Sequence, residues 1–456
     1  MPVQATNENS TPLTRERLLR EFRSSERPTD RWLIGIEHEK IGVHSDGRPV
    51  AISGPRGVQA LLQRFELEGF TTKREGGHIV GASGPRRLGG SEVTEKLSLE
   101  PGGQVEQAAS PVRSTWEARQ EVLNHLRQLN HFAQPWDIQF ISGGFRPFGA
   151  FDDVEWLGKP RYGVMRNYLP TRGTLGVEMM KRTATMQMNF DFSDEANAFA
   201  RFRSAMGVAP IVTAMAAASP LSEGKPNGFK SYRAKIWTDT DPDRCGVPAF
   251  SFSTENFYED YADWVLDVPV FFIERDGDLV PANGLSFRRF MAEGLQRHTA
   301  TAADWELHLS TVFPEVRLKH TLEVRGADAA PLPTAFGVAA VCRGIADDAE
   351  ACAAAWNLVK DISISERLDA REPVARLALQ AKLGRHTVQA LAVELVAIAR
   401  DGLSRLPGGG DDIALLEPLA SNVREGRCPA DQMLEDFAEC KGQPEALVKR
   451  WLLRSE

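Results

Sequence analysis

The sequence predicts an α+β protein in which strands and helices are mixed, followed by an almost entirely helical C-terminal part. Two observations carry this prediction. Between residues 32 and 324, short segments of alternating polar and apolar residues are mixed with helical patterns and Gly/Pro turns, without the regular strand–helix alternation of a parallel sheet. From residue 333 onward the pattern is helical and rich in Ala and Leu.

We therefore expect three regions along the 456 residues: a tail and short helix at 1–30, a mixed α+β unit at 31–332, and a helical part at 333–456 that packs on the same unit. A chain of this length buries a large core without cross-links. Its 42% apolar and 25% charged residues are ordinary for a globular protein, which excludes a disordered, collagen-like or coiled-coil chain.

Charge and cysteine content limit the kinds of partner and the cellular compartment that the sequence predicts. The net charge of −8 argues against a nucleic-acid partner, because basic residues supply most of that affinity. Five cysteines without a Cys-x-x-Cys pair indicate a reducing compartment, with neither a disulfide scaffold nor a zinc ribbon. Residues 1–14 lack the apolar core of a secretory signal and no run approaches 18 apolar residues, so we expect a cytoplasmic protein without a membrane partner.

Four segments have helical periodicity, at residues 14–23, 114–132, 194–219 and 387–403. The third follows Ser193, which we expect to be its N-cap, and Pro210 is expected to kink or divide it. The tract at 406–411 contains Pro-Gly-Gly-Gly and is expected to be a loop or linker. These helices by themselves indicate core scaffold.

The chemically informative segments are strands with one polar face. In residues 34–40, alternation places Glu37 and Glu39 on one face and Ile36 and His38 on the other, where His38 is expected to be structural. Two neighbouring carboxylates repel each other unless a cation or a proton lies between them. A solvated strand face has the same appearance, so this pair alone does not define a site.

Two further strands repeat the pattern. Residues 317–325 place on one face Arg317, Lys319, Thr321, Glu323 and Arg325. Residues 183–191 present the uncharged polar side chains of Thr183, Thr185, Gln187 and Asn189. Amides and hydroxyls are better suited to orienting a ligand than to solubility, and we give ligand contact and a solvated face equal weight here.

Glu100 and Glu106 flank a Pro-Gly-Gly turn and complete a set of strand-borne carboxylates with Glu37, Glu39 and Glu323. Oxygen ligands of this kind suit Mg²⁺ or Mn²⁺, and Mg²⁺ commonly shares its coordination shell with phosphates. Three cationic residues are candidates to hold such phosphates: Arg182, Lys319 and Arg325. The combination predicts nucleotide chemistry, although the sequence has no P-loop, kinase or Rossmann signature.

These segments resemble glutamate–cysteine ligase of the plant and proteobacterial type. The matching motifs occur in family order over roughly residues 30–440, which makes the resemblance far more specific than any one of them. They are IGIEHEKIG (34–42), LSLEPGGQ (97–104), RYGVMRNYLP (161–170), RTATMQMN (182–189), EGKPNG (223–228), IWTDTD (236–241), LDVP (266–269), FPEVRLK (313–319) and EVRGAD (323–328).

The resemblance implies a glutamine-synthetase-like fold, in which an antiparallel sheet curls into a funnel with metal carboxylates on its inner face. It also implies an ATP-dependent ligase that uses Mg²⁺ or Mn²⁺. The γ-carboxylate of L-glutamate attacks ATP to form γ-glutamyl phosphate and ADP, and the amine of L-cysteine then displaces phosphate to give γ-glutamylcysteine. This is the first step of glutathione or related thiol biosynthesis.

The resemblance also implies a role for each candidate residue. The metal ligands would be Glu37, Glu39, Glu100, Glu106, Glu323 and Gln187. The nucleotide would be held by Arg182, Lys319 and Arg325, and catalysis would depend on Glu323, Lys319 and Arg325, the last stabilising the transferring phosphoryl group. Glutamate would be bound through its α-carboxylate by Arg161 and Arg233, in a pocket lined by Trp237 and Met180, with Asn189 also in contact with substrate.

The surroundings of these residues depart from the family pattern. Gly77-His78 replaces an Asp-Asn pair, residues 107–111 differ, and residues 329–334 lack two arginines. Trp116 and Phe336 occupy the positions of the cysteine pair that forms a regulatory disulfide in the plant enzymes. These changes leave open a related ligase that joins glutamate to a different amine, or a non-catalytic homologue. We expect a monomer or a homodimer, and no cysteine-binding residue stands out.

Overall fold

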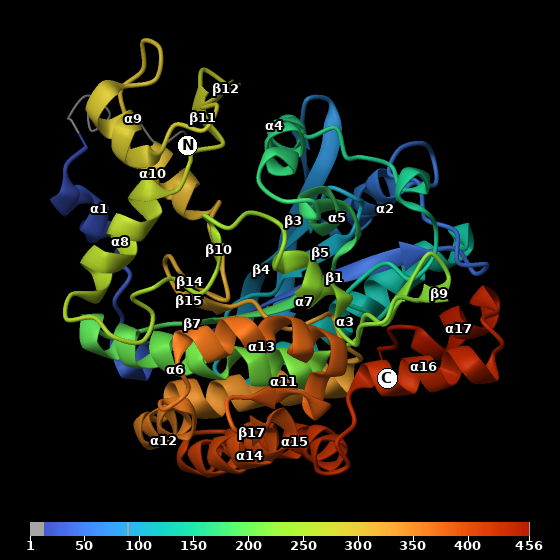
Figure 1. Ribbon diagram of the computed structural model, residues 1–456. Coiled ribbons are helices and arrows are strands. Elements are labelled where there is room, and N and C mark those ends of the chain that lie inside the picture. Colours follow the sequence, from blue (N-terminus) through green and yellow to red (C-terminus); the bar gives the residue numbers. More distant parts are fainter. Residues whose placement is uncertain (1–12, 89–90, 456) are drawn as a thin grey trace.

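A computed structural model describes residues 13–88 and 91–455 (Figure 1). Most of the predicted N-terminal tail, residues 1–12, lies outside this range. Strands and helices are mixed up to β15, and helices dominate from Leu332 onward, so the predicted fold class is confirmed. Among the described helices, none is both long enough and apolar enough to cross a bilayer.

The main sheet is antiparallel and has nine strands, with the spatial order β14-β15-β7-β1-β5-β4-β3-β2 and with β6 paired to the far end of β1. Its strands are β1 Ile34–Val43, β2 Thr71–Glu75, β3 His78–Leu88, β4 Ser91–Leu99, β5 Val105–Ala108, β6 Gln139–Ile141, β7 Met186–Phe190, β14 Val316–Leu318 and β15 Leu322–Val324.

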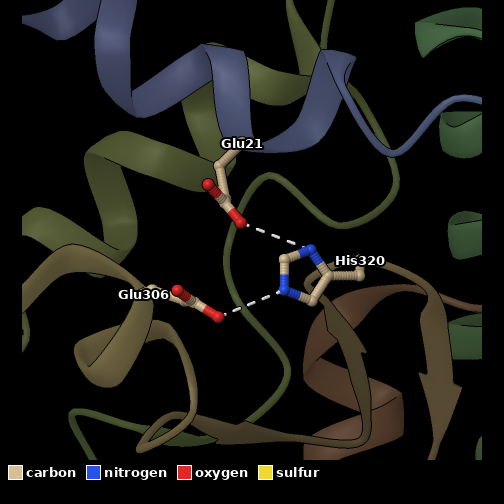
Figure 2. A group of neighbouring side chains, drawn as sticks. All are labelled: Glu21, Glu306 and His320. Carbon is tan, nitrogen blue, oxygen red and sulfur yellow. Dashed lines mark hydrogen bonds and ion pairs between the residues drawn. The ribbon is translucent and has the colours of Figure 1, made fainter. Parts of the chain in front are cut away.

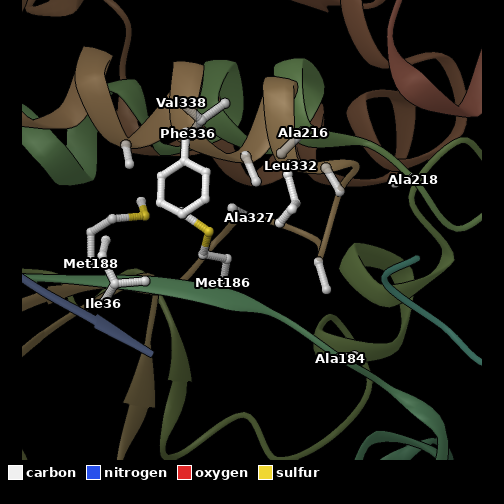
Figure 3. Packing of buried hydrophobic residues seen from close by; sticks show 14 of the residues in the cluster. Ile36, Ala184, Met186, Met188, Ala216, Ala218, Ala327, Leu332, Phe336 and Val338 are labelled. Carbon is white, nitrogen blue, oxygen red and sulfur yellow. The ribbon is translucent and has the colours of Figure 1, made fainter. Parts of the chain in front are cut away.

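A layer of helices covers one face of this sheet (Figure 1). It is formed by α3 Thr115–Ala133, α6 Glu195–Ala216 and α11 Leu332–Asp347, with α12 Ala349–Val359, α14 Val388–Arg405 and α15 Gly409–Arg424 packed on them. Figure 3 shows Ile36, Met186 and Met188 of the sheet directed at Phe336 of α11. One continuous core therefore joins the sheet to the C-terminal helices.

A second core lies beside the β14–β15 edge of the sheet and is built on aromatic side chains, among them Phe22, Tyr258, Tyr261 and Trp305. It joins α1 Arg15–Arg23, α8 Phe257–Asp267, α9 Phe287–Glu293 and α10 Ala302–Leu309, together with the hairpin of β11 Phe272–Arg275 and β12 Asp278–Pro281. These elements stand on the left of Figure 1.

The remaining elements connect or cap these layers. The helices are α2 Val58–Gln63, α4 Pro160–Tyr168, α5 Gly176–Arg182, α7 Tyr232–Trp237, α13 Ile364–Leu377, α16 Pro429–Glu439 and α17 Pro444–Trp451. The strands are β8 Leu221–Ser222, β9 Lys225–Pro226, β10 Cys245–Gly246, β13 Phe313–Pro314, β16 Lys382–Leu383 and β17 His386–Thr387. α4, α5 and α7 lie on the side of the sheet that the helical layer leaves uncovered (Figure 1).

The four predicted helices are present as α1, α3, α6 and α14, but the predicted N-cap of α6 is wrong. Its N-cap is Asp194, whose carboxylate accepts a hydrogen bond from the backbone N–H of Asn197 at 2.9 Å, and not Ser193. Pro210 does not divide the helix, because the second half of α6 is almost completely buried and its packing outweighs the lost backbone hydrogen bond.

Two predicted segments also end differently. The loop expected at 406–411 is shorter, since Gly408 adopts a left-handed φ of 70° and α15 begins at Gly409. Residues 317–325 are not one strand: they reverse direction at Lys319–Thr321 and form the hairpin of β14 and β15. Alternation cannot reveal this reversal, because the hairpin returns Glu323 to the same face as Arg317.

Candidate active site

The uncovered face of the main sheet carries the predicted polar residues. Because Ile36, Met186 and Met188 are directed into the core, their neighbours along each strand, Glu37 and Gln187, point to the opposite face. The predicted division of β1 into a carboxylate face and a face with Ile36 and His38 is confirmed, since His38 is fully buried against the helical layer.

Strand register brings these side chains together from four separate strands. Glu37 lies opposite Gln187, and Glu39 lies opposite Glu106. Glu323 lies opposite Asn189 on the other side of β7. Antiparallel neighbours on one face have Cβ atoms about 4.5–5.5 Å apart, so the polar groups form one continuous field across β5, β1, β7 and β15.

Hydrogen bonds hold the carboxylates of β1 in place. The side-chain amide of Gln187 donates to Glu37 at 3.1 Å, and that of Asn189 donates to the other oxygen at 3.3 Å. The backbone N–H of Thr185 donates to Glu39 at 3.0 Å. Gln187 and Asn189 therefore orient Glu37. Because both amides have a protein partner, this strand face is not simply a solvated surface.

Glu100 and Glu106 meet across the Pro-Gly-Gly turn that joins β4 to β5. Gly103 has a left-handed φ of 79°, and a Cβ on Gly102 would lie 1.9 Å from the carbonyl oxygen of Lys181, so both positions require glycine. The hydroxyl of Ser98 donates to Glu106 at 2.9 Å. The turn thus delivers two carboxylates to the edge of the same polar field.

The carboxylates on this face of the sheet have too few positive charges around them to offset their mutual repulsion. Burial and the neighbouring carboxylates raise the pKa of Glu37, of Glu39 and of Glu106 from 4.5 to about 8. Burial and the charge of Glu39 likewise raise the pKa of Glu100. Carboxylates in such a cluster bind either protons or a cation, because their oxygens are too close for all to be ionised without one.

Glu323 is the exception, because two arginines neutralise it. Arg317 donates to one carboxylate oxygen at 3.0 and 2.6 Å, and Arg325 donates to the other oxygen and to Gln187. Burial alone would raise the pKa of Glu323, but Arg317 and Arg325 hold it below its ordinary value. Glu323 is therefore already paired with arginines, and Arg325 in turn lies next to Arg233.

Arg233 and Trp237 project from the short helix α7 next to Arg325. Arg233 is buried and donates to the backbone carbonyl of Arg325 at 2.9 Å, and its guanidinium carbon lies 6.0 Å from the centre of the Trp237 ring. A small cavity of about 30 Å³ is lined here by Arg233, Trp237, Phe313 and Arg325. Arg233 and Trp237, both predicted to bind glutamate, thus lie at one end of the carboxylate field.

The other predicted residues lie in different surroundings. Arg161, on α4, lies close enough to Glu100 to favour its ionised form, and the pKa of Glu100 responds to it. Lys319 lies in the turn of the β14–β15 hairpin, where burial and the nearby Arg317 lower its pKa. Met180 is buried in the main core. Arg182 is held by Glu178 at 2.6 Å and by Glu223 at 3.1 Å, so its charge is already balanced.

Sequence reasoning missed two residues that organise the site. Arg317 shares the predicted polar face, but only the chain reversal at the hairpin places it against Glu323. Asp328 is buried and accepts hydrogen bonds from the hydroxyls of Ser219 at 2.7 Å and Ser231 at 2.9 Å, which fixes the start of α7 and hence Arg233. A lone aspartate near the end of a motif gives no signal of such a role.

A second group of titratable side chains lies at the tip of the same hairpin (Figure 2). One ring nitrogen of His320 lies 3.3 Å from Glu21 of α1, and the other lies 3.5 Å from Glu306 of α10. His320 and Glu306 are exposed, and each ring nitrogen already faces its own carboxylate. The arrangement ties the hairpin to α1 and α10.

Comparisons with known proteins agree with this geometry. The profile of the glutamate-cysteine ligase family 2 (GCS2) matches residues 33–450. The chloroplastic glutamate–cysteine ligase of Brassica juncea is 37% identical over 96% of this chain and 83% of its own length, and that of Arabidopsis thaliana is 37% identical over 96% and 82%.

A solved structure shows the same fold. The glutamate–cysteine ligase of Francisella tularensis, determined in complex with AMP, superposes with a TM-score of 0.56 at 14% identity over 92% of this chain and 87% of that one. The family profile and the plant relatives span nearly the whole chain, including every candidate residue. The chain therefore belongs to glutamate-cysteine ligase family 2.

Proposed function

We propose that this chain joins L-glutamate to L-cysteine at the expense of ATP, giving γ-glutamylcysteine, ADP and phosphate. The observation that carries the proposal is the five-carboxylate field, Glu37, Glu39, Glu100, Glu106 and Glu323, bordered at one end by Arg325 and Arg233. Its family relatives bear the name of this activity, and the related structure from Francisella tularensis contains AMP.

The carboxylates fit divalent cations. Glu39, Glu100 and Glu106 have no ion pair with Lys, Arg or His within residues 13–88 and 91–455, and the raised pKa of each reflects that missing positive charge. An all-oxygen donor set with side-chain amide support suits Mg²⁺ or Mn²⁺. We propose that these ions are held by Glu37, Glu39, Glu100, Glu106, Glu323 and Gln187, and that they would neutralise the triphosphate.

The reaction needs phosphoryl transfer first because a carboxylate is a poor electrophile. An oxygen of the glutamate γ-carboxylate attacks the γ-phosphorus of ATP, and the bond to the leaving ADP oxygen breaks. The amine nitrogen of cysteine then attacks the carbonyl carbon of γ-glutamyl phosphate. Phosphate leaves, the amine gives up a proton, and the amide bond remains.

This chain's own residues supply position and positive charge for both steps. Arg325 lies between Glu323, Gln187 and the ring of Trp237, where its guanidinium would face the charge on the transferring phosphoryl group. Arg233 and Arg161 would pair with the α-carboxylate of glutamate, beside Trp237 and Met180. Lys319 and Arg182 would contact the phosphates, although Arg182 would have to exchange a carboxylate partner to do so.

The decisive test is ADP release by purified protein with Mg·ATP, glutamate and a panel of amines. Turnover that requires cysteine, or the cysteine analogue 2-aminobutyrate, supports the proposal. Turnover with another amine alone would assign a related ligase in its place, and no ADP release with any acceptor would make the chain a non-catalytic homologue. Product mass separates γ-glutamylcysteine from a simple hydrolysis of ATP.

A further inference from the structure

A cavity of about 670 Å³ lies apart from the carboxylate field, between the segment before β1 and the helices α6, α11 and α12. This volume is in the range of sites for small organic ligands, about 300–1,000 Å³. None of the candidate active-site residues lines it. The proposed ligase reaction therefore leaves this cavity without a role.

Arg203 on α6 is the unusual residue in its wall. Its guanidinium carbon lies 5.2 Å from the ring centre of Phe199 and 5.1 Å from that of Trp356. Its Nε is buried without a hydrogen-bond acceptor, and the described part of the chain offers this arginine no ion pair. A buried Nε–H without an acceptor is costly, so this donor is suited to an acceptor from outside the chain.

A second cation in the same wall is also unneutralised. Arg113 donates only to the backbone carbonyl of Asp30, at 3.2 Å, among the contacts of its side chain within residues 13–88 and 91–455. The two other arginines of the cavity are neutralised, Arg201 by Asp347 at 2.6 Å and Arg343 by Asp412. Asp30 also lines the cavity and offsets one of these two charges, so the wall keeps a surplus of one positive charge, shared between Arg203 and the exposed Arg113.

Aromatic and small apolar side chains make up much of the remaining wall. Two indole rings contribute to it, those of Trp32 and Trp356, together with four small side chains: Ala200, Ala346, Ala349 and Ala353. Aromatic walls beside unpaired guanidinium groups recognise ring-bearing anions, because the ring packs on apolar surface while the charged group meets arginine.

We propose that this cavity binds a small organic anion with an aromatic body, anchored by Arg203 and Arg113. The ring would pack on the apolar side chains of the wall. Binding there would be independent of the active site, since the cavity walls and the carboxylate field share no residue.

The probe for this proposal is 2-naphthalenesulfonate, with the neutral 2-naphthol as the uncharged comparison. Calorimetric titration of the full chain is expected to give one sulfonate per chain, bound at least about tenfold more tightly than the naphthol, since a charge-assisted hydrogen bond is lost with the neutral ring. The affinity is expected to stay unchanged when Mg²⁺ and glutamate, which has no ring, are present at saturation.

Variants locate the site. Arg203→Gln is expected to weaken sulfonate binding about tenfold or more, and Arg203→Lys less, because it keeps the charge. The matched control is Arg166→Gln, since Arg166 is an exposed arginine 4.8 Å from the ring of Trp156 and outside the cavity. Ala353→Trp, at the exposed rim of α12, is expected to abolish binding by filling the space without changing any charge.

Three outcomes would overturn the proposal. They are equal affinities for sulfonate and naphthol, equal losses in Arg203→Gln and Arg166→Gln, and displacement of the sulfonate by glutamate. Unaltered binding in Ala353→Trp would also refute it, and this variant remains informative if Arg203→Gln fails to fold.

Discussion

Glu39 and Glu106 lie directly opposite each other in the neighbouring antiparallel strands β1 and β5. Like charges in this position destabilise a sheet. Burial and repulsion from neighbouring carboxylates raise the pKa of both groups. A pair of this kind is retained at the expense of stability where a bound cation uses it.

Replacing one member of the pair is expected to stabilise the metal-free protein and disable the enzyme. Above pH 8, where both carboxyl groups ionise, Glu106→Gln removes the repulsion with Glu39. The melting temperature in EDTA is then expected to rise by about 1 °C, which corresponds to about 1 kcal/mol in a chain of this length. The rise produced by Mg²⁺ is expected to shrink, and turnover to fall about 100-fold or more. Thermal unfolding with and without Mg²⁺ and an ADP-release assay measure these effects.

The control is Glu68→Gln, because Glu68 is an exposed glutamate outside the site. It is expected to leave both melting temperatures and turnover unchanged. A Glu106→Gln protein that melts lower in EDTA than the parent, or that keeps the full response to Mg²⁺, would contradict a shared cation.

Stability in the absence of metal is expected to fall as the pH rises. The pKa of Glu37, Glu39 and Glu106 moves from 4.5 to about 8 on folding, so between these values the folded chain binds more protons than the unfolded chain. The free energy of unfolding then decreases with increasing pH across this window. In EDTA, the melting temperature is expected to be lower at pH 8 than at pH 6, and Mg²⁺ to reduce the difference.

The matched comparison for this pH effect is the double variant Glu39→Gln with Glu106→Gln, which removes two of the three titrating groups. Its melting temperature in EDTA is expected to depend much less on pH. An identical pH dependence in the parent and the double variant would place the effect elsewhere in the chain.

Removing the charge of Glu323 is expected to reduce turnover by orders of magnitude without unfolding the protein. Glu323→Gln leaves Arg317 and Arg325 without their shared carboxylate and takes away one proposed metal ligand. The control is Glu293→Gln, which breaks a surface pair with Arg289 at 2.8 Å and is expected to have almost no effect. Near-normal turnover by Glu323→Gln, with an intact circular dichroism spectrum, would refute the metal role.

Arg233→Lys is expected to raise the KM for glutamate about tenfold or more, with a smaller change in kcat. Lysine keeps the charge but loses the two parallel hydrogen bonds that an arginine makes with a carboxylate. Arg405→Lys is the control, since Arg405 is exposed, makes two hydrogen bonds with the carboxylate of Asp348 at 2.6 and 3.0 Å, and lies outside the site. An unchanged KM for glutamate alongside a raised KM for ATP would assign Arg233 to the nucleotide.

Local pattern predicted much of this architecture. The alternation of Glu37 and Glu39 against Ile36 and His38 fixes which face of β1 is polar, because successive side chains on a strand point to opposite sides. Helical periodicity predicted α1, α3 and α14 to within one or two residues at each end. The start of α6 was predicted less well, because its N-cap is Asp194 and not Ser193.

The sequence by itself determined the family, the polar strand faces and the residue types available for binding metal and nucleotide. Only the tertiary structure decided which of them meet. Arg317 reaches Glu323 because the chain reverses at Lys319–Thr321, and Arg233 reaches Arg325 because Asp328 anchors the start of α7. The unpaired charge of Arg203 likewise emerges only once every acceptor around it has a position. Periodicity is a property of neighbours along the chain, whereas charge balance depends on neighbours in space.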